Sequence, residues 1–165
     1  MRVGQRAGTF LICRKNLTER VLVDPSCNSS DPSHDRLVSE CHAALGPDFK
    51  VFVGLEELSF PMMAVGACGL MNAVGNLQPR ILADLCDAVW RNDLVAAQAL
   101  HHQLFEINQA VFFDTNPIPM KYMMKRLGLL PANEHRLPMV PATPELERRL
   151  DAVLKRVGLL EDRAA

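Results

Sequence analysis

The sequence predicts an α/β fold in which a short parallel sheet is followed by a helical extension. Two short apolar runs typical of strands alternate with segments whose apolar residues recur every three or four positions. This helix–strand–helix–strand–helix order is typical of a parallel sheet with crossover helices. Three further helical patterns follow without an intervening strand. At 165 residues, 48% of them hydrophobic, the chain is long enough for one globular domain with a sizeable core.

The first regular elements are predicted between His34 and Gly54. A helix begins near His34, and Gly46-Pro47 ends it. Its apolar face consists of Leu37, Val38, Cys41 and Leu45. The following run, 49–53, is rich in Phe and Val and is bounded by Gly54, which predicts a strand.

The next elements complete the alternation. We expect a short helix over 58–65, with Pro61 in its early turns, and a second strand over 69–74. Pro79 then suits the first turn of a helix. One face of that helix carries Leu82, Leu85, Cys86 and Val89.

Three helices form the predicted extension. The first covers roughly 94–112, the second starts at Pro117 and the third starts at Pro144. The second carries a methionine-rich face, which predicts core packing or subunit contact rather than a cofactor site. The residues of this face are Met120, Met123, Met124 and Leu127.

The first 32 residues predict little regular structure. Short apolar runs at 9–13 and 21–23 are candidate strands, and a cluster of Pro, Asn, Asp and Ser over 24–33 predicts a loop or disorder. The run at 9–13 is shorter than a signal-peptide core, and Arg14-Lys15 follows it. We therefore expect a cytoplasmic protein.

Charge and composition exclude several classes of partner. The formal net charge of −1 gives no electrostatic reason to expect nucleic acid or an anionic membrane. No apolar run approaches the roughly 20 residues of a membrane-spanning helix. The five cysteines are odd in number and include no C-x-x-C pair, which predicts free thiols rather than disulfides or a zinc site.

A metal site is not expected on the helix predicted over 94–112. His101 and His102 lie about one turn from Glu106, which is a faint indication of metal ligands. The spacing does not match H-E-x-x-H, and His102 with Glu106 at i, i+4 is typical of a solvated pair.

Three segments in a fixed order carry a resemblance to a known family. They are the glycine-rich run 66–76, the two-proline segment 114–121 and the proline-punctuated segment 136–141. They resemble the C-terminal region of the dihydrodipicolinate synthase and N-acetylneuraminate lyase family. The likeness covers roughly 31–160. It implies the C-terminal half of a (β/α)8 TIM barrel.

The resemblance divides the chain into three parts. Residues 1–30 are unmatched. Residues 31–92 would be the last part of the barrel, with 49–53 as its seventh strand and 69–73 as its eighth. Residues 93–165 would be a three-helix C-terminal extension.

The resemblance also implies a chemistry. Family members are pyruvate-dependent lyases of the class I aldolase type, in which a lysine forms a Schiff base with a 2-keto acid and no metal or organic cofactor takes part. Backbone groups after the seventh and eighth strands border the pyruvate, and the matching positions are Gly54 and Met71. Alternatively, Gly54 simply ends a strand and Met71 packs inside the barrel. Where relatives often carry two aspartates, this chain has Leu55 and Glu56.

The Schiff-base lysine has no counterpart in this resemblance. Residues 31–35 resemble the run that follows the lysine, which places Ser30 at the lysine position. A serine cannot form an imine, because imine formation requires a primary amine. Lys15, Lys50 and Lys121 are interpreted as ordinary solvated lysines, so no catalytic residue is assigned.

Two interpretations follow from Ser30. In the first, the chain is a truncated or frame-shifted product of the lyase family and is inactive alone. In the second, it is a non-catalytic half-barrel that associates with a full-length paralogue or with itself as a homo-oligomer. The exposed edge of a half-barrel sheet favours the first, because its backbone groups would lack partners.

Overall fold

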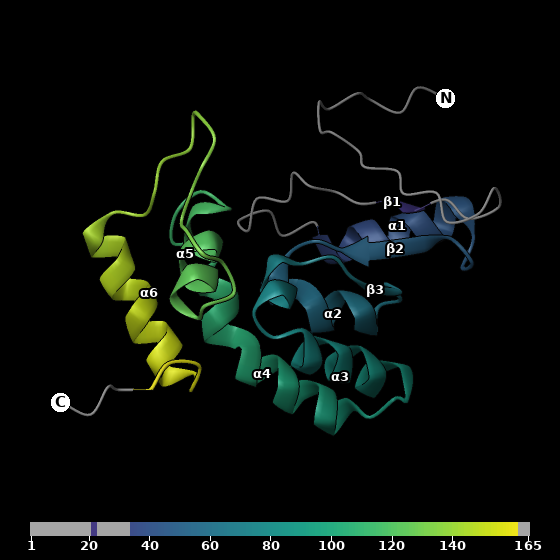
Figure 1. Ribbon diagram of the computed structural model, residues 1–165. Helices are drawn as coiled ribbons and strands as arrows, with labels where there is room; N and C mark the ends of the chain where they lie inside the picture. The colour runs from purple at the N-terminus through teal and green to yellow at the C-terminus, as the bar shows by residue number, and fades with distance from the viewer. Residues whose placement is uncertain (1–20, 23–33, 162–165) are drawn as a thin grey trace.

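The computed structural model describes residues 21–22 and 34–161 (Figure 1). Three features of the sequence analysis lie outside the described residues: Ser30, the candidate strand at 9–13 and the polar cluster at 24–33. The elements in chain order are β1 (Val21–Leu22), α1 (His34–Leu45), β2 (Lys50–Val53), η1 (Glu56–Leu58), α2 (Ser59–Ala64), β3 (Gly69–Leu70), η2 (Ala73–Asn76), α3 (Pro79–Trp90), α4 (Leu94–Ala110), α5 (Ile118–Arg126) and α6 (Pro144–Arg156).

The described strands form a parallel sheet in the order β1-β2-β3. Val21 pairs with Lys50 at one side of β2, and Phe52 pairs with Gly69 at the other. The chain leaves β2, passes through η1 and α2, and returns as β3 beside it. The predicted parallel α/β arrangement is therefore confirmed for this part of the chain, and the candidate strand at 21–23 is confirmed at Val21 and Leu22.

The second strand is shorter than predicted. β3 ends at Leu70, and the expected last residues of the strand turn into η2 at Ala73. Met71 N still donates to Val53 O at 2.8 Å, which is the last main-chain link along the two strands. The strand ends there because the backbone at Ala73 turns to bond a side chain from the neighbouring loop.

The turn between α2 and β3 depends on a glycine. Gly66 has a φ of +112°, and a Cβ there would lie 2.8 Å from His42 Cε1. His42 Nε2 also lies 3.1 Å from Phe49 O, so α1 is held to the start of β2. A side chain at position 66 would therefore strain the backbone and displace the ring of His42.

Proline and capping residues set the helix starts largely as predicted. Pro79 and Pro144 each occupy the first turn of a helix, and α5 begins at Ile118, one residue after Pro117. Thr143 accepts a hydrogen bond from Leu146 N at 3.2 Å, which caps α6. Pro61 lies in the first turn of α2, where its missing N–H leaves no bond unmade.

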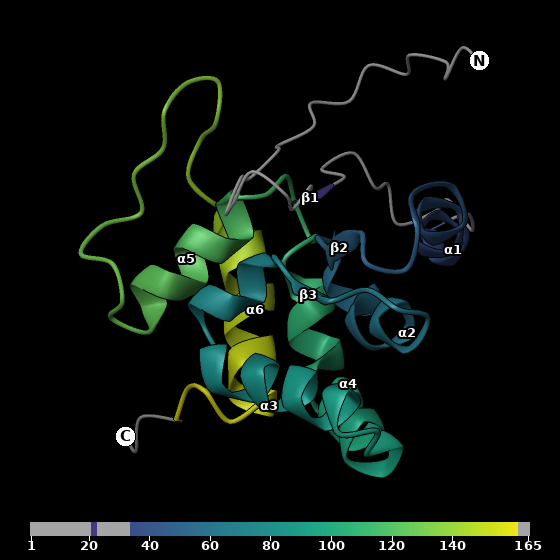
Figure 2. The same ribbon diagram turned by 90° about the vertical axis from the view of Figure 1, so that its right-hand side faces the viewer.

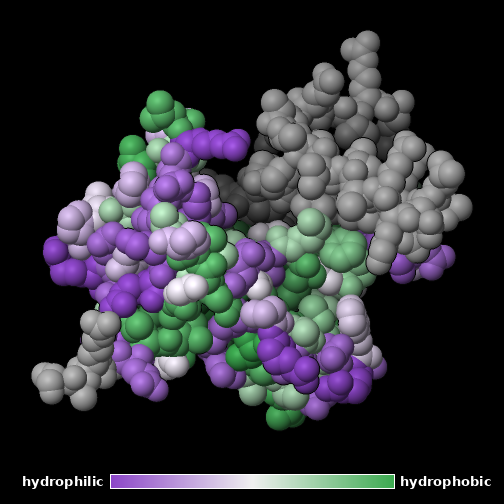
Figure 3. All heavy atoms as spheres, in the orientation of Figure 1, coloured by the Kyte–Doolittle hydropathy of each residue, from purple (hydrophilic) through white to green (hydrophobic). Residues whose placement is uncertain are grey.

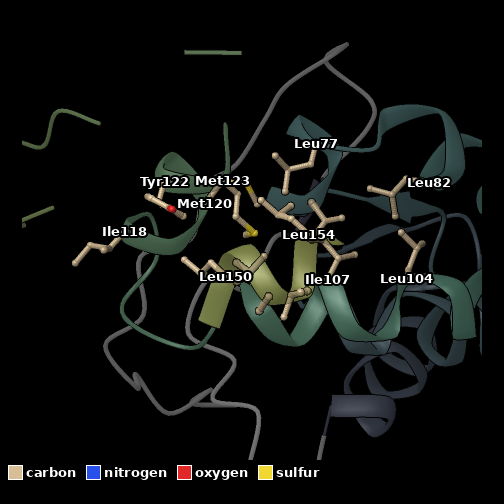
Figure 4. Packing of buried hydrophobic residues seen from close by; sticks show 14 of the residues in the cluster. Leu77, Leu82, Leu104, Ile107, Ile118, Met120, Tyr122, Met123, Leu150 and Leu154 are labelled. Carbon is tan, nitrogen blue, oxygen red and sulfur yellow. The ribbon is translucent and has the colours of Figure 1, made fainter. Parts of the chain in front are cut away.

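The larger of two apolar clusters lies among α3, α4, α5 and α6 (Figure 4). Ile107 of α4 lies near Leu154 of α6, and Met123 of α5 lies near Leu150. Leu104 of α4 lies beside Leu82 of α3. The methionine face of α5 is thus largely core, as predicted, with Met120 and Met123 buried. Figures 1 and 2 show α5 and α6 at one end of the molecule and α1 with the sheet at the other.

The smaller cluster lies between α1, β2 and α2. Its buried members are Val38, Cys41, Val51, Val53, Met62, Met63 and Ala67. Leu70 and Val89 pack against both clusters and join them. One predicted member is wrong: Leu45, the last residue of α1, is exposed, as are Ala43 and Ala44 before it.

Candidate functional site

The two predicted substrate-binding residues lie side by side at one edge of the sheet. Gly54 follows the last residue of β2, and Met71 follows the last residue of β3. Because these strands are parallel neighbours, their carboxyl ends meet at the same edge. Ligands of parallel α/β proteins bind at this edge, so the geometry fits a binding role for both positions.

Met71 does not pack in an apolar interior within the described residues. Its relative exposure is 47%, whereas Val53 at the end of β2 is buried. The alternative in which Met71 packs inside a complete barrel stays a prediction, because the described strands β1, β2 and β3 form only part of such a barrel. Gly54 is also exposed, which leaves its backbone accessible at the same edge.

A buried carboxylate lies next to this edge, on Glu56. Glu56 is only 2% exposed, although it lies two residues after Gly54. Its Oε1 accepts a hydrogen bond from Ala73 N at 2.6 Å, two residues after Met71. Burial raises the pKa of Glu56, and backbone N–H groups, that of Ala73 foremost, act in the opposite direction.

Three polar side chains complete the network around Glu56. Ser59 Oγ donates to Glu56 O at 2.6 Å, and Asn72 Nδ2 donates to Ser59 Oγ at 2.9 Å. Asn108 of α4 donates to the same Glu56 carbonyl at 3.1 Å. Asn108 is buried, and its Oδ1 has no hydrogen-bond partner among the described residues. The network thus joins η1, α2, the end of β3 and α4.

This network was not predicted from the sequence, although one of its members leaves a signal there. Asn108 falls on the same helical face as Leu104, Ile107 and Val111, which are buried. A polar residue at a core position of an amphipathic helix indicates a buried hydrogen bond. Glu56 was noted only as a departure from a family pattern, and nothing in its sequence neighbourhood predicts its burial.

The lysines considered in the sequence do not converge on this edge. Lys50 begins β2, at the opposite end of the strand from Gly54. Lys121 lies near the start of α5 and donates to the main-chain oxygen of Glu134. Lys15 lies outside the described residues.

The histidines of α4 make their ring contacts away from the sheet edge, with Phe60 and with each other. The rings of His101 and Phe60 lie 5.8 Å apart between centroids at a tilt of 46°, and Glu106 pairs with Arg156 of α6 at 2.7 Å. The predicted His102–Glu106 pair is not seen. Among the described residues, no group of three potential metal ligands is found, and no helix is long and apolar enough to cross a membrane.

Comparison with known proteins identifies the family. The model of the dihydrodipicolinate synthetase family matches residues 32–157, most of the chain. The chain belongs to the dihydrodipicolinate synthetase family. Gly54, Met71 and the whole Glu56 network fall inside the matched segment. Ser30 precedes it, so the assignment of Ser30 to the lysine position stays a prediction.

Individual relatives agree. A 4-hydroxy-tetrahydrodipicolinate synthase of Thermus thermophilus is 47% identical over 115 residues, covering 70% of this chain and 38% of the relative. The synthase of Aquifex aeolicus is 38% identical over 130 residues, covering 79% of this chain and 44% of the relative. This chain therefore spans less than half the length of these relatives.

Solved structures give the same result. The dihydrodipicolinate synthase of Aquifex aeolicus superposes with a TM-score of 0.74 at 36% identity, over 79% of this chain and 44% of that one. A prophage protein of the same family from E. coli K12, solved in complex with pyruvate, superposes with a TM-score of 0.66 at 25% identity. It is matched over 75% of this chain and 43% of its own.

Proposed function

We propose that this chain supplies the last two strands and the C-terminal helical extension of a (β/α)8 barrel in a pyruvate-dependent lyase. The observation that carries the proposal is the position of Gly54 and Met71, at the carboxyl ends of adjacent parallel strands within the family match. In this interpretation 49–53 and 69–73 are the seventh and eighth barrel strands. Residues 93–165 form the extension.

The substrate in this proposal is pyruvate or a related 2-keto acid. The pyruvate complex of the E. coli family member supports the choice of ligand. The main-chain groups at Gly54 and Met71 would lie along the keto acid. They would orient it rather than react with it, because a backbone amide is not a nucleophile of the required kind.

The chain on its own is proposed not to perform the lyase reaction. A Schiff base forms when a primary amine attacks the keto carbon and water leaves, and a serine hydroxyl cannot complete that step. Ser30 is predicted to stand at the amine position. The sequence has no C-x-x-C pair, which favours free thiols. Free thiols suit a reducing compartment such as the cytoplasm.

Reductive trapping tests this proposal. The purified chain is incubated with pyruvate, reduced with borohydride and measured by intact mass. We expect an unchanged mass for the wild type. Peptide mapping of a single reduced-imine adduct would identify a reacting lysine and contradict the role given to Ser30.

A matched pair of variants sharpens the test. Ser30→Lys places the amine at the predicted position, whereas Ser26→Lys adds the same group four residues earlier. An adduct in Ser30→Lys alone would support both the pyruvate site and the lysine alignment. Equal labelling of the two variants would contradict the alignment.

The second candidate function is a non-catalytic interaction module. β3 is the last strand in the sheet order of the described residues, and a strand edge offers unpaired backbone groups to another chain. On the face shown in Figure 3, hydrophobic residues lie interspersed with hydrophilic ones. Light scattering after size exclusion distinguishes a self-associating module from a monomer, and a folded, stable oligomer would favour this candidate.

A further inference from the structure

Glu56 occupies an unusual position for a carboxylate. It follows the exposed Gly54 by two residues, yet its own side chain is 2% exposed. Burying a carboxylate is costly unless hydrogen bonds replace the lost water. A short bond from Ala73 N, at 2.6 Å, provides such a replacement. The carboxylate is therefore committed to protein contacts and is not free to meet a ligand.

The carboxylate acts as a cap for η2 from outside that element. The first N–H groups of any helical turn lack partners within the turn. Asn72, which precedes η2, makes no capping bond with its side chain, because that side chain donates to Ser59 instead. Glu56 accepts from Ala73 N in its place, and the Val74 N–H also acts to lower the pKa of Glu56.

The main chain of Glu56 is itself anchored from behind. Its carbonyl oxygen accepts from Ser59 Oγ at 2.6 Å and from Asn108 Nδ2 at 3.1 Å. Asn108 is buried on α4, the longest helix described. The loop after β2 is thus fixed to the helical core. The Glu56 carboxylate in this loop accepts a hydrogen bond from Ala73 N in the segment after β3.

These bonds set the spacing of the two candidate binding positions. Gly54 lies two residues before the anchored Glu56, and Met71 lies two residues before the capped Ala73. The one main-chain link that spans the ends of the strands themselves is Met71 N to Val53 O at 2.8 Å. Beyond that point, two hydrogen bonds tie the segments together, Ala73 N to the Glu56 carboxylate and Asn72 Nδ2 to Ser59 Oγ.

We propose that Glu56 is a positioning residue for the keto-acid pocket. It holds the turn after β3 against the turn after β2, so that the backbone at Gly54 and Met71 keeps the spacing a small keto acid requires. This inference rests on the proposed function for the pocket itself. The hydrogen bond between Glu56 and Ala73 N is present whether or not the pocket binds a keto acid.

The bond is tested first, by NMR of the full chain. As the pH rises and Glu56 ionises, the amide proton of Ala73 should shift downfield, because a carboxylate is a stronger acceptor than a carboxylic acid. Glu56→Gln should abolish this titration. Glu57→Gln, the matched control in the same turn, should retain it. If the pH-dependent shift of the Ala73 amide proton persisted unchanged in Glu56→Gln, the proposal would be overturned.

Pyruvate binding is tested next, with the same variants. We expect Glu56→Gln to weaken pyruvate binding about tenfold, because a neutral amide oxygen is a weaker acceptor for Ala73 N than a carboxylate. Glu56→Ala should weaken it further, since glutamine keeps one acceptor oxygen. Far-ultraviolet circular dichroism checks that each variant is folded, and the isosteric glutamine keeps the test usable where alanine unfolds the chain.

The outcomes separate the two proposals. If Glu56→Gln loses the Ala73 titration and binds pyruvate as tightly as the wild type, the positioning role is wrong. If the wild type binds no pyruvate while the Ala73 titration is present, the proposed function fails, and the pocket role of Glu56 fails with it. Weakened binding together with a lost titration supports both.

Discussion

The two apolar clusters of the molecule differ in how they are built. The cluster among α3–α6 contains several fully buried large residues from four helices, including Leu85, Leu104, Leu150 and Leu154. The cluster among α1, β2 and α2 has fewer buried members, in which valines are joined by smaller or more flexible side chains: Val38, Val51, Val53, Cys41, Met62, Met63 and Ala67. The helical region therefore has the larger buried core, and Leu70 and Val89 join the sheet region to it.

The candidate binding edge lies in the region with the smaller of the two apolar clusters. Gly54 and Met71 belong to the sheet region, and Asn108, Leu70 and Val89 connect that region to the helices. Binding loops are generally drawn from parts of a protein with fewer buried contacts. The candidate edge thus lies in the sheet region and is connected to the helices through these residues.

The largest effect is expected from the helical core. Leu150 is fully buried on α6, so Leu150→Ala should lower the free energy of unfolding by about 2–5 kcal/mol, measured by urea denaturation. Leu137 is 90% exposed, and Leu137→Ala should change it by less than about 0.5 kcal/mol. Similar losses for both variants would contradict the assignment of the main core to α3–α6.

A smaller and more local effect is expected in the sheet region. Met63 is buried in the smaller cluster, with its sulfur 3.8 Å from Cys86 Sγ. Met63→Ala should cost about 2 kcal/mol, because a small cluster can partly collapse around the lost side chain. Hydrogen exchange should rise in α1 and β2 and stay unchanged in α6. Equal acceleration in α6 would mean that the two regions unfold as one unit.

The connection between the regions is tested through Asn108. Asn108→Ala removes the bond to Glu56 O and should cost about 1–2 kcal/mol. Amide exchange at Ala73 should also increase, because the anchor of Glu56 is lost. The exposed neighbour Gln109 serves as the control. If Gln109→Ala increased amide exchange at Ala73 as much as Asn108→Ala does, the idea that Asn108 of α4 holds the loop would be contradicted.

The smallest effect is a pH dependence at the contact between α2 and α4. Burial, and then the neighbouring His102, lower the pKa of His101 below its ordinary value of 6.5. The unfolded chain therefore binds the proton more readily, and stability falls as the pH drops below 6.5. His101→Asn should reduce this loss between pH 7.5 and pH 5.5 in thermal unfolding. His102→Asn should reduce it less; the reverse order would contradict the burial of His101.

Much of the fold followed from local patterns. The helix over α3 was predictable because Pro79 and the spacing of Leu82 and Leu85 depend only on neighbouring residues. The parallel order of β2 and β3 followed from the helix between them. The end of β3 is wrong in the prediction, because three of the four residues 71–74 are apolar and continue the run that begins in the strand. Its backbone is turned by a carboxylate 17 positions away along the chain.

The candidate site divides in the same way. The positions of Gly54 and Met71 could be predicted from motifs, because residues that follow neighbouring parallel strands always share an edge. The exposure of Met71 and the burial of Glu56 could not, since each depends on which helices cover that edge.

The sequence by itself determined the family, the helix starts and the parallel strands, because caps, prolines and apolar periodicity act over a few residues. Tertiary structure alone decided that Glu56 is buried, that its carboxylate caps η2, and that Asn108 anchors it from α4. Those contacts join residues up to 52 positions apart. No local pattern encodes them, because a buried charge is tolerated only where distant backbone and side-chain donors converge on it.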